Sequence, residues 1–199
     1  MSEGGRLLGK EAHVAWASGY CEVVEPTASC QQTLNISLFF DGTNNNDDED
    51  NVKWRDSLTK SHTNVARLYN VALDDDTKGI YKYYIPGVGT PFPKIGEFTY
   101  SEGGKAFAAG FNQRCVWAYT RVLNAAYRSI RKDARWDLID KDDAHMLCNA
   151  GAYSNKQDFK QCFEPYLTRL KAAHAQAVEK GRWSNTIKQI WINVIGFSR

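Results

Sequence analysis

Three β-rich apolar runs, separated by helical patterns, constrain most strongly what this 199-residue chain can fold into. The runs are LNISLFF at 34–40, IYKYYI at 80–85, and a stretch from about Ile187 to Ile195. Between the first two, apolar residues spaced i, i+3, i+4 and i+7 predict a helix with one buried face (Val65, Leu68, Tyr69 and Ala72). Strands that alternate with helices favour parallel βαβ units. We therefore predict an α/β fold with a mostly parallel sheet and flanking helices.

The connection between the second and third runs is long and holds two further helical patterns. The first extends from Gln113 to Ile130 and the second from Phe159 to Ala177, where Pro165 predicts a kink or a restart. Because residues 131–183 exceed a normal helix-to-strand connection, we interpret them as a helical insertion packed over or beside the sheet. We predict an N-terminal extension at 1–33 and one domain, or part of one, at 34–199.

Charge, cysteines and apolar runs exclude several classes of function. A net charge of +2 gives no field that would attract nucleic acid as a partner. The 5 cysteines are scattered, with no C-x-x-C pair and no zinc-like spacing, so no metal site is expected from them. The first 30 residues hold no apolar stretch of signal-peptide length, and no run approaches a transmembrane helix. We expect synthesis in the cytoplasm and, if the protein is exported, a route without a cleavable signal.

The last apolar run leads into Gly196-Phe197-Ser198-Arg199, which has the pattern of a nucleophile elbow. Ile190 to Ile195 are close to a buried-strand pattern, and an elbow needs a small residue two positions before the serine, which Gly196 supplies. The small residue expected two positions after the serine would lie beyond Arg199. On this interpretation Ser198 is the nucleophile, and the N–H of Arg199 faces the oxyanion of an acyl-transfer intermediate. A G-x-S tripeptide alone is more often a plain turn, so the preceding strand carries the prediction.

Two glycine-containing loops come after the first and second runs. In a fold with such an elbow, the loop DGTNNN at 41–46 would supply the second oxyanion donor. The segment Gly87-Val88-Gly89-Thr90 is too short for a dinucleotide-binding fingerprint, and we interpret it as a turn that lines the site. Two alternatives remain for the first loop: a simple strand-ending turn, or the aspartate motif of haloacid-dehalogenase-type phosphatases. The second fails chemically, because Phe39 occupies the position of the nucleophilic aspartate.

Cofactor candidates are few. The acidic loop at 47–50 could bind calcium, but it lacks the EF-hand spacing, which favours a solvated loop. His62 and His174 lie on a helix start and a helical pattern, where a structural role is the commoner one. We expect no cofactor, with calcium as the alternative.

Four separated motifs resemble one family. FFDGTNNN at 39–46, HTNVARLY at 62–69, YYIPGVGT at 83–90 and IGFSR at 195–199 together resemble the type VI secretion phospholipase effectors, the Tle family. The catalytic domain of that family belongs to the α/β-hydrolase superfamily and has an elbow that reads G-F-S-R-G-A. The resemblance extends from about Leu34 to Arg199 and keeps the order of the motifs.

The resemblance implies roles position by position. Ser198 corresponds to the nucleophile, Asp41, Gly42 and Thr43 to the oxyanion-side loop, and Gly87–Thr90 to a loop that lines the site. The acidic residue and the histidine of the family's triad lie downstream of the elbow and have no counterpart in this sequence. The chain therefore resembles the N-terminal half of the domain, and we expect it to be inactive alone.

The resemblance also implies a biological setting. It implies a serine esterase or phospholipase that attacks membrane phospholipids of rival bacteria after delivery to the periplasm or membrane of the target cell. Its expected partners are a secretion-spike protein of the VgrG type, a cognate immunity protein and the remaining C-terminal part of the same protein. Two other hypotheses stay open: a non-catalytic module that keeps the hydrolase scaffold, and a hydrolase of small soluble esters.

Overall fold

The computed structural model of the protein describes residues 31–46, 63–102, 109–132, 136–150 and 156–196. These residues form three β-strands and four α-helices, joined by loops and short 3₁₀ turns. All of them belong to the unit Gln31–Arg199, one of two into which the chain divides. The first strand begins at Gln32, two residues before the predicted start of the domain at Leu34. The boundary between residues 33 and 34 stays a prediction.

A three-stranded parallel sheet is the centre of the described fold. Strand β1 (Gln32–Phe40) lies in the middle, with β2 (Ile80–Ile85) on one side and β3 (Ile187–Gly196) on the other. Both neighbours run parallel to β1. The predicted α/β class with a parallel sheet is therefore confirmed.

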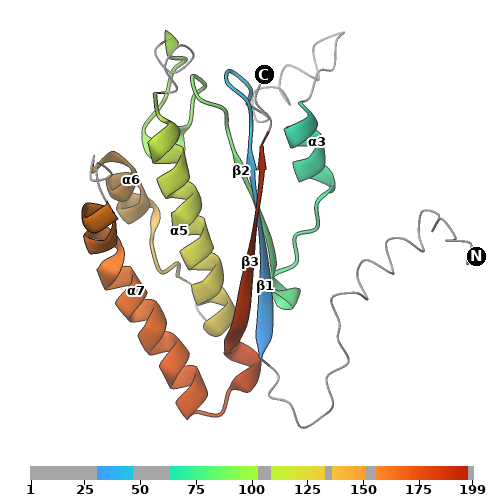
Figure 1. The fold of residues 1–199 in the computed structure, drawn as a ribbon, viewed down its shortest axis with the longest axis vertical. Coiled ribbons are helices and arrows are strands. Elements are labelled where there is room, and N and C mark those ends of the chain that lie inside the picture. Colours follow the sequence, from blue (N-terminus) through green and yellow to red (C-terminus); the bar gives the residue numbers. More distant parts are fainter. Residues whose placement is uncertain (1–30, 47–62, 103–108, 133–135, 151–155, 197–199) are drawn as a thin grey trace, which may run out of the picture. The chain divides into compact units, whose positions relative to one another are not determined.

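Helices cover both faces of the sheet. Helix α3 (Asn64–Val71) connects β1 to β2 and lies on one side, while α5 (Phe111–Ile130), α6 (Lys141–Asn149) and α7 (Lys156–Glu179) lie on the other (Figure 1). Short 3₁₀ turns, η1 (Asp76–Lys78), η2 (Pro93–Ile95) and η4 (Trp183–Asn185), join these elements. The chain thus leaves β1 on one face and returns to β3 across the other.

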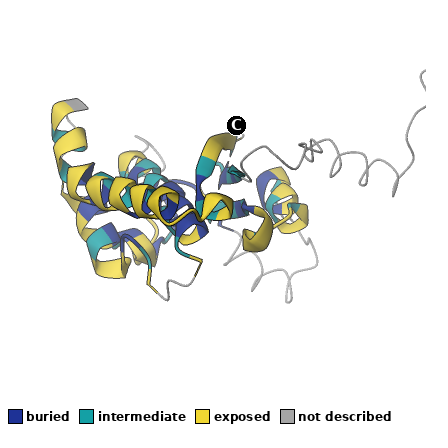
Figure 2. Ribbon diagram, turned by 90° about the horizontal axis from the view of Figure 1, so that it is seen from below, coloured by how far each residue is buried: buried dark blue, intermediate teal, exposed yellow. Residues whose placement is uncertain are grey.

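The main core fills the space between the sheet and α5. Leu34, Ile36 and Leu38 alternate along β1 and are buried, as the period of two in a strand requires. They join apolar residues of α5, such as Val116 and Val122, in one cluster. Buried residues accordingly gather between the helices and the sheet, and exposed ones cover the outer surface of the helices (Figure 2).

Helix α7 contains Pro165, where the sequence predicts a kink or a restart. It runs through 24 residues without the expected restart, with the proline inside it. Phe163, Tyr166 and Ala173 are buried along its length, and the contacts of α7 with α5 hold both halves of the helix in place. Tertiary packing therefore outweighs the cost of the missing backbone N–H.

Strand β3 contradicts its predicted burial. Ile190, Trp191, Ile192 and Val194 are exposed, at 38%, 53%, 49% and 67% of their surface. The cause is its position, because β3 lies at the edge of the described sheet and no described strand pairs with its outer side. Its apolar sequence is that of an internal strand, and its place here is that of an edge strand.

Candidate active site

The candidate site lies where β1 and β3 end side by side. Their pairing is continuous from Thr33 and Gln189 to Phe40 and Gly196. Because the strands are parallel, the loop that begins at Asp41 and the turn predicted after Gly196 leave the same edge of the sheet. In parallel α/β sheets, ligands bind outside this carboxyl edge.

Ser198 and Arg199 lie outside the described residues, so the orientation of the predicted elbow is not part of the structure. Gly196 is the last described residue of β3. A Cβ at this position would lie 3.4 Å from the carbonyl oxygen of Phe40, which is an ordinary contact. Packing against β1 therefore does not require a glycine here, and its role in an elbow stays a prediction.

Asp41 fixes the start of the first loop through its carboxylate. One oxygen accepts a hydrogen bond from the N–H of Gly42 at 2.7 Å. The other accepts from the hydroxyls of Thr63 at 2.7 Å and Tyr84 at 2.6 Å. Thr63 also caps α3 by accepting from the N–H of Ala66. The carboxylate thus ties the end of β1 to the start of α3 and to β2.

Two amides of the 41–46 loop, those of Gly42 and Thr43, are candidates for the second oxyanion donor, and they differ in their availability. The N–H of Gly42 is already engaged by Asp41 at 2.7 Å. Thr43 is exposed, and no partner for its amide occurs among the described residues. A turn comes next, in which Asn44 has a positive φ of 65°. In the geometry described, Thr43 is therefore the better placed of the two donors.

The second loop packs beneath the first. Residues 87–90 are all buried, so they support the 41–46 loop rather than form an open surface. The N–H of Gly87 donates to Asn45 at 2.9 Å, and the N–H of Asn44 donates to Val88 at 2.9 Å. A Cβ on Gly87 would overlap the carbonyl oxygen of Gly42. The two backbones approach so closely that only glycine fits at position 87.

Arg114, in the first turn of α5, is the residue that sequence reasoning missed at this site. Its side chain is 1% exposed and forms an ion pair with Glu97 at 2.7 Å. Its guanidinium also donates to backbone carbonyl oxygens, among them those of Pro86 at 2.8 Å and Thr90 at 2.9 Å. A signal existed in the sequence: Arg114 precedes the buried Trp117 by one helical turn, and an arginine on a buried face needs fixed partners.

An apolar hollow lies close to this edge. It has a volume of about 460 Å³ and is lined by residues of β1, α5 and β3. Phe40 and Phe111 line it near the site, and Ile192 and Val194 line it from β3. The same β3 side chains are exposed, so the hollow and the open edge of the sheet form one apolar surface.

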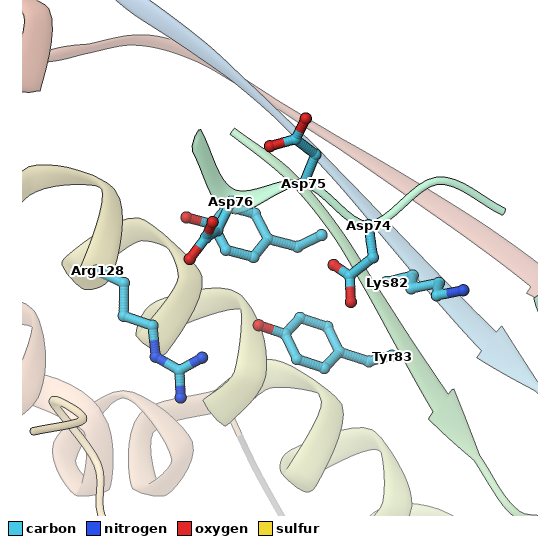
Figure 3. Close-up of a pocket in the computed structure, with 7 residues that line it drawn as sticks. Asp74, Asp75, Asp76, Lys82, Tyr83 and Arg128 are labelled. Atoms are coloured by element: carbon cyan, nitrogen blue, oxygen red, sulfur yellow. The ribbon is translucent and has the colours of Figure 1, made fainter. Parts of the chain in front are cut away.

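A second cavity, of about 340 Å³, lies at the other end of β2 (Figure 3). Asp74, Asp75 and Asp76 line it just before the strand begins, together with Tyr83 and Arg128. Burial raises the pKa of Tyr83 to about 12. Since its acidic residues precede β2, this cavity is remote from the loops at the carboxyl ends of the strands.

The described residues hold no group of three or more His, Cys, Asp or Glu side chains that could bind a metal ion. The acidic loop at 47–50, the calcium alternative, lies outside the described residues, as does His62. His174 accepts a hydrogen bond from the N–H of Ile187 at 3.2 Å, which is a structural contact of the kind expected for it. In the part of the chain that the structure describes, no helix has the length and apolarity needed to cross a membrane.

The fold and the site define a class: an α/β protein whose candidate site gathers at the carboxyl edge of a parallel sheet. The family described as "T6SS, Phospholipase effector Tle1-like, catalytic domain" matches residues 35–199, and the chain belongs to this family. The description of the family is that of a phospholipase effector of type VI secretion, a hydrolase at the level of the family.

A solved structure supports the same fold. A crystal structure of an uncharacterized protein from Pseudomonas aeruginosa superposes with a TM-score of 0.72 at 30% sequence identity. The match covers 85% of this chain and 24% of that one, so this chain spans about a quarter of its solved relative. No curated protein sequence matches the chain.

Proposed function

We propose that the protein is a serine phospholipase that hydrolyses acyl esters of membrane phospholipids as an antibacterial effector of type VI secretion. Membership of the phospholipase effector family supports the reaction class. The observation that carries the proposal is the pairing of Phe40 with Gly196. It places the start of the loop at Asp41 beside the end of β3, two residues before Ser198 in the sequence.

In the proposed mechanism the Oγ of Ser198 attacks the ester carbonyl carbon and gives up its proton to a histidine. The oxyanion of the tetrahedral intermediate accepts hydrogen bonds from the N–H groups of Arg199 and Thr43. The C–O bond to the leaving alcohol then breaks, and the alcohol takes the proton. Water hydrolyses the acyl-enzyme and releases the fatty acid. The histidine and its acidic partner come from the part of the full-length protein beyond the elbow.

We further propose how the chain is divided. Residues 1–33 form an extension, residues 34–199 form the N-terminal part of an α/β-hydrolase domain, and residues 131–183 form a helical insertion. The packing of α6 and α7 against α5 supports the insertion. The remaining polypeptide of the same protein completes the domain.

The proposed setting follows from the family. The protein is made in the cytoplasm of the producing bacterium, binds a secretion-spike protein, and is delivered to the periplasm or membrane of a target cell. There it acts on phospholipid unless a cognate immunity protein binds it. Calcium is not required in this proposal.

Active-site labelling tests the proposal. We expect a fluorophosphonate to label the full-length protein at Ser198, and Ser198→Ala to lower the hydrolysis of phospholipid vesicles by at least about 10³-fold. Ser184→Ala is the matched control, because Ser184 lies in η4, before β3 begins, and bonds only its neighbour Asn185 among the described residues.

Three outcomes would contradict the proposal. Full hydrolysis by the Ser198→Ala variant would remove the serine from the mechanism. Absence of both labelling and hydrolysis in the unaltered protein would favour a non-catalytic module. A faster rate on a short-chain soluble ester than on vesicles would favour an esterase of small substrates.

A further inference from the structure

We infer that Arg114 is the positioning residue of this site: it holds the 86–90 loop, which in turn sets the backbone of the 41–46 loop that carries the amide of Thr43. The catalytic consequence rests on the proposed function. The structural part does not, because it concerns contacts among described residues only. Arg114 itself is buried behind the 86–90 loop, so it acts through backbone and not by touching substrate.

Every N–H of the Arg114 guanidinium has a partner. The Nε donates to Pro86, and Nη2 donates to Gly87 at 3.2 Å and to Thr90 at 2.9 Å. The Nη1 donates to the carbonyl of Gly110 at 3.2 Å and forms the ion pair with Glu97. Arginine is the only side chain with five N–H donors in a rigid fork, and lysine offers three on a flexible stem. The site is therefore specific for arginine.

The contacts continue from the 86–90 loop into the 41–46 loop. The carbonyl oxygen of Gly87 accepts a hydrogen bond from Nη2 of Arg114, and the N–H of Gly87 donates to the carbonyl oxygen of Asn45. The N–H of Asn44, next to Thr43, donates to Val88. Because a Cβ on Gly87 has no room beside Gly42, a shift of the 86–90 backbone must move the 41–46 backbone as well. Two hydrogen bonds and one close approach thus link the loop that the guanidinium holds to the loop that carries the amide of Thr43.

The coupling predicts a specific catalytic effect. A displaced oxyanion donor reduces the stabilisation of the transition state, whereas the contacts that bind the rest of the substrate are unchanged. Loss of the guanidinium fork should therefore lower kcat and leave KM nearly unchanged. A general loss of folded protein would instead lower the number of reactive serines, and the fluorophosphonate label counts those directly.

Hydrogen exchange and kinetics on the full-length protein test the inference. In Arg114→Lys we expect the amides of Asn44 and Gly87 to exchange at least about 10-fold faster. We expect kcat per labelled serine to fall about 10- to 100-fold, with KM within about twofold. Arg128→Lys is the matched control on the same helix, since Arg128 is half-exposed and pairs with Asp137. It should leave both readouts unchanged.

A second variant covers the case in which Arg114→Lys does not fold. Gly110→Ala adds a Cβ that would overlap the Glu97 carboxylate and press on Nη1 of Arg114 at 2.7 Å. Although position 110 is in neither loop, the same two amides should exchange faster. Unchanged exchange in the variants would overturn the coupling. Faster exchange with unchanged kcat would overturn the catalytic role, whereas an inactive unaltered protein would refute the proposed function and leave the coupling measurable by exchange.

Discussion

Single residues at the carboxyl edge show that this region is built for a fixed backbone. Asp41 uses both oxygens of its carboxylate, on Gly42, Thr63 and Tyr84. The backbone of Gly87 accepts a hydrogen bond from Arg114 and donates one to Asn45, and no space is left there for a side chain. Hydrogen bonds to a carboxylate are among the stronger ones in proteins. A loop held in this way presents the amide of Thr43 in one orientation.

The close approach of Gly87 to Gly42 can be tested by one added methyl group. Gly87→Ala should lower the free energy of unfolding by about 3 kcal/mol, because the new Cβ meets backbone that cannot move aside. Gly181→Ala is the control: it has a φ of +63° and open space around it, so only the left-handed backbone costs energy, about 1 kcal/mol. Urea unfolding followed by circular dichroism measures both. Equal losses would show that the two loops can separate easily.

At the scale of elements, the sequence predicts those parts that carry a periodic pattern. All three strands, α3 and α5 lie within a few residues of their predicted positions. Helix α6 was not predicted, because it is short, begins in a charged stretch and buries only Ala144, Leu147 and Cys148. Its one local signal is Asp140, whose carboxylate accepts from the N–H of Asp143.

The features that the sequence did not predict depend on long-range contacts. The edge position of β3 is a matter of strand order, which apolar content cannot encode. At the candidate site, too, local features were predicted and long-range contacts were not. The sequence identified the loops at Asp41 and Gly87, because glycine after a strand is a local signal. It missed Arg114, because backbone carbonyls that accept from a guanidinium leave no pattern in the side-chain sequence.

Asn124 holds the segment that leads into α6. Its side chain is 1% exposed, donates to the carbonyl of Ile139 at 2.9 Å and accepts from the N–H of the same residue at 2.9 Å. Asn124→Ala leaves both backbone groups unpaired, so we expect a loss of about 2–3 kcal/mol in unfolding free energy. Asn185→Ala removes the hydrogen bond to the carbonyl of Ile130 and one from the exposed hydroxyl of Ser184, which water can replace, and should cost about 1 kcal/mol. Thermal unfolding of both variants gives the comparison, and a smaller loss for Asn124→Ala would contradict this account.

At the scale of the whole molecule, the edge of β3 is an exposed apolar surface among the described residues. From Gln189 to Gly196 the strand has no charged residue, and natural edge strands usually carry one. Strand β2, at the other edge, contains Lys82, whose ammonium group donates to Tyr69 and Ala72. One edge therefore carries a charged residue and the other does not over these residues. The apolar edge continues into the hollow beside α5.

An apolar edge predicts self-association of the 199-residue chain when it is prepared by itself. We expect its apparent mass in light scattering to rise with concentration, and Val194→Lys to reduce this rise. Val71→Lys is the matched control, because Val71 is 79% exposed at the end of α3 and belongs to no strand. Monomeric behaviour of the unaltered chain at all concentrations would show that the exposed edge of β3 does not mediate self-association.

The pairing of β1 with β3 has a further consequence, for changes in chain length. Its one irregularity lies between Gln32 and Thr33, at the end remote from the site, where Lys188 is the extra residue. An inserted amino acid can be accommodated there without altering the rest of the pairing. Beyond Thr33, one residue inserted into β3 would turn every later side chain of that strand to the opposite face. It would also displace Gly196 by about 3.3 Å relative to Asp41. The number of residues in β1 and β3 between this irregularity and the site therefore cannot change without moving the two strand ends apart.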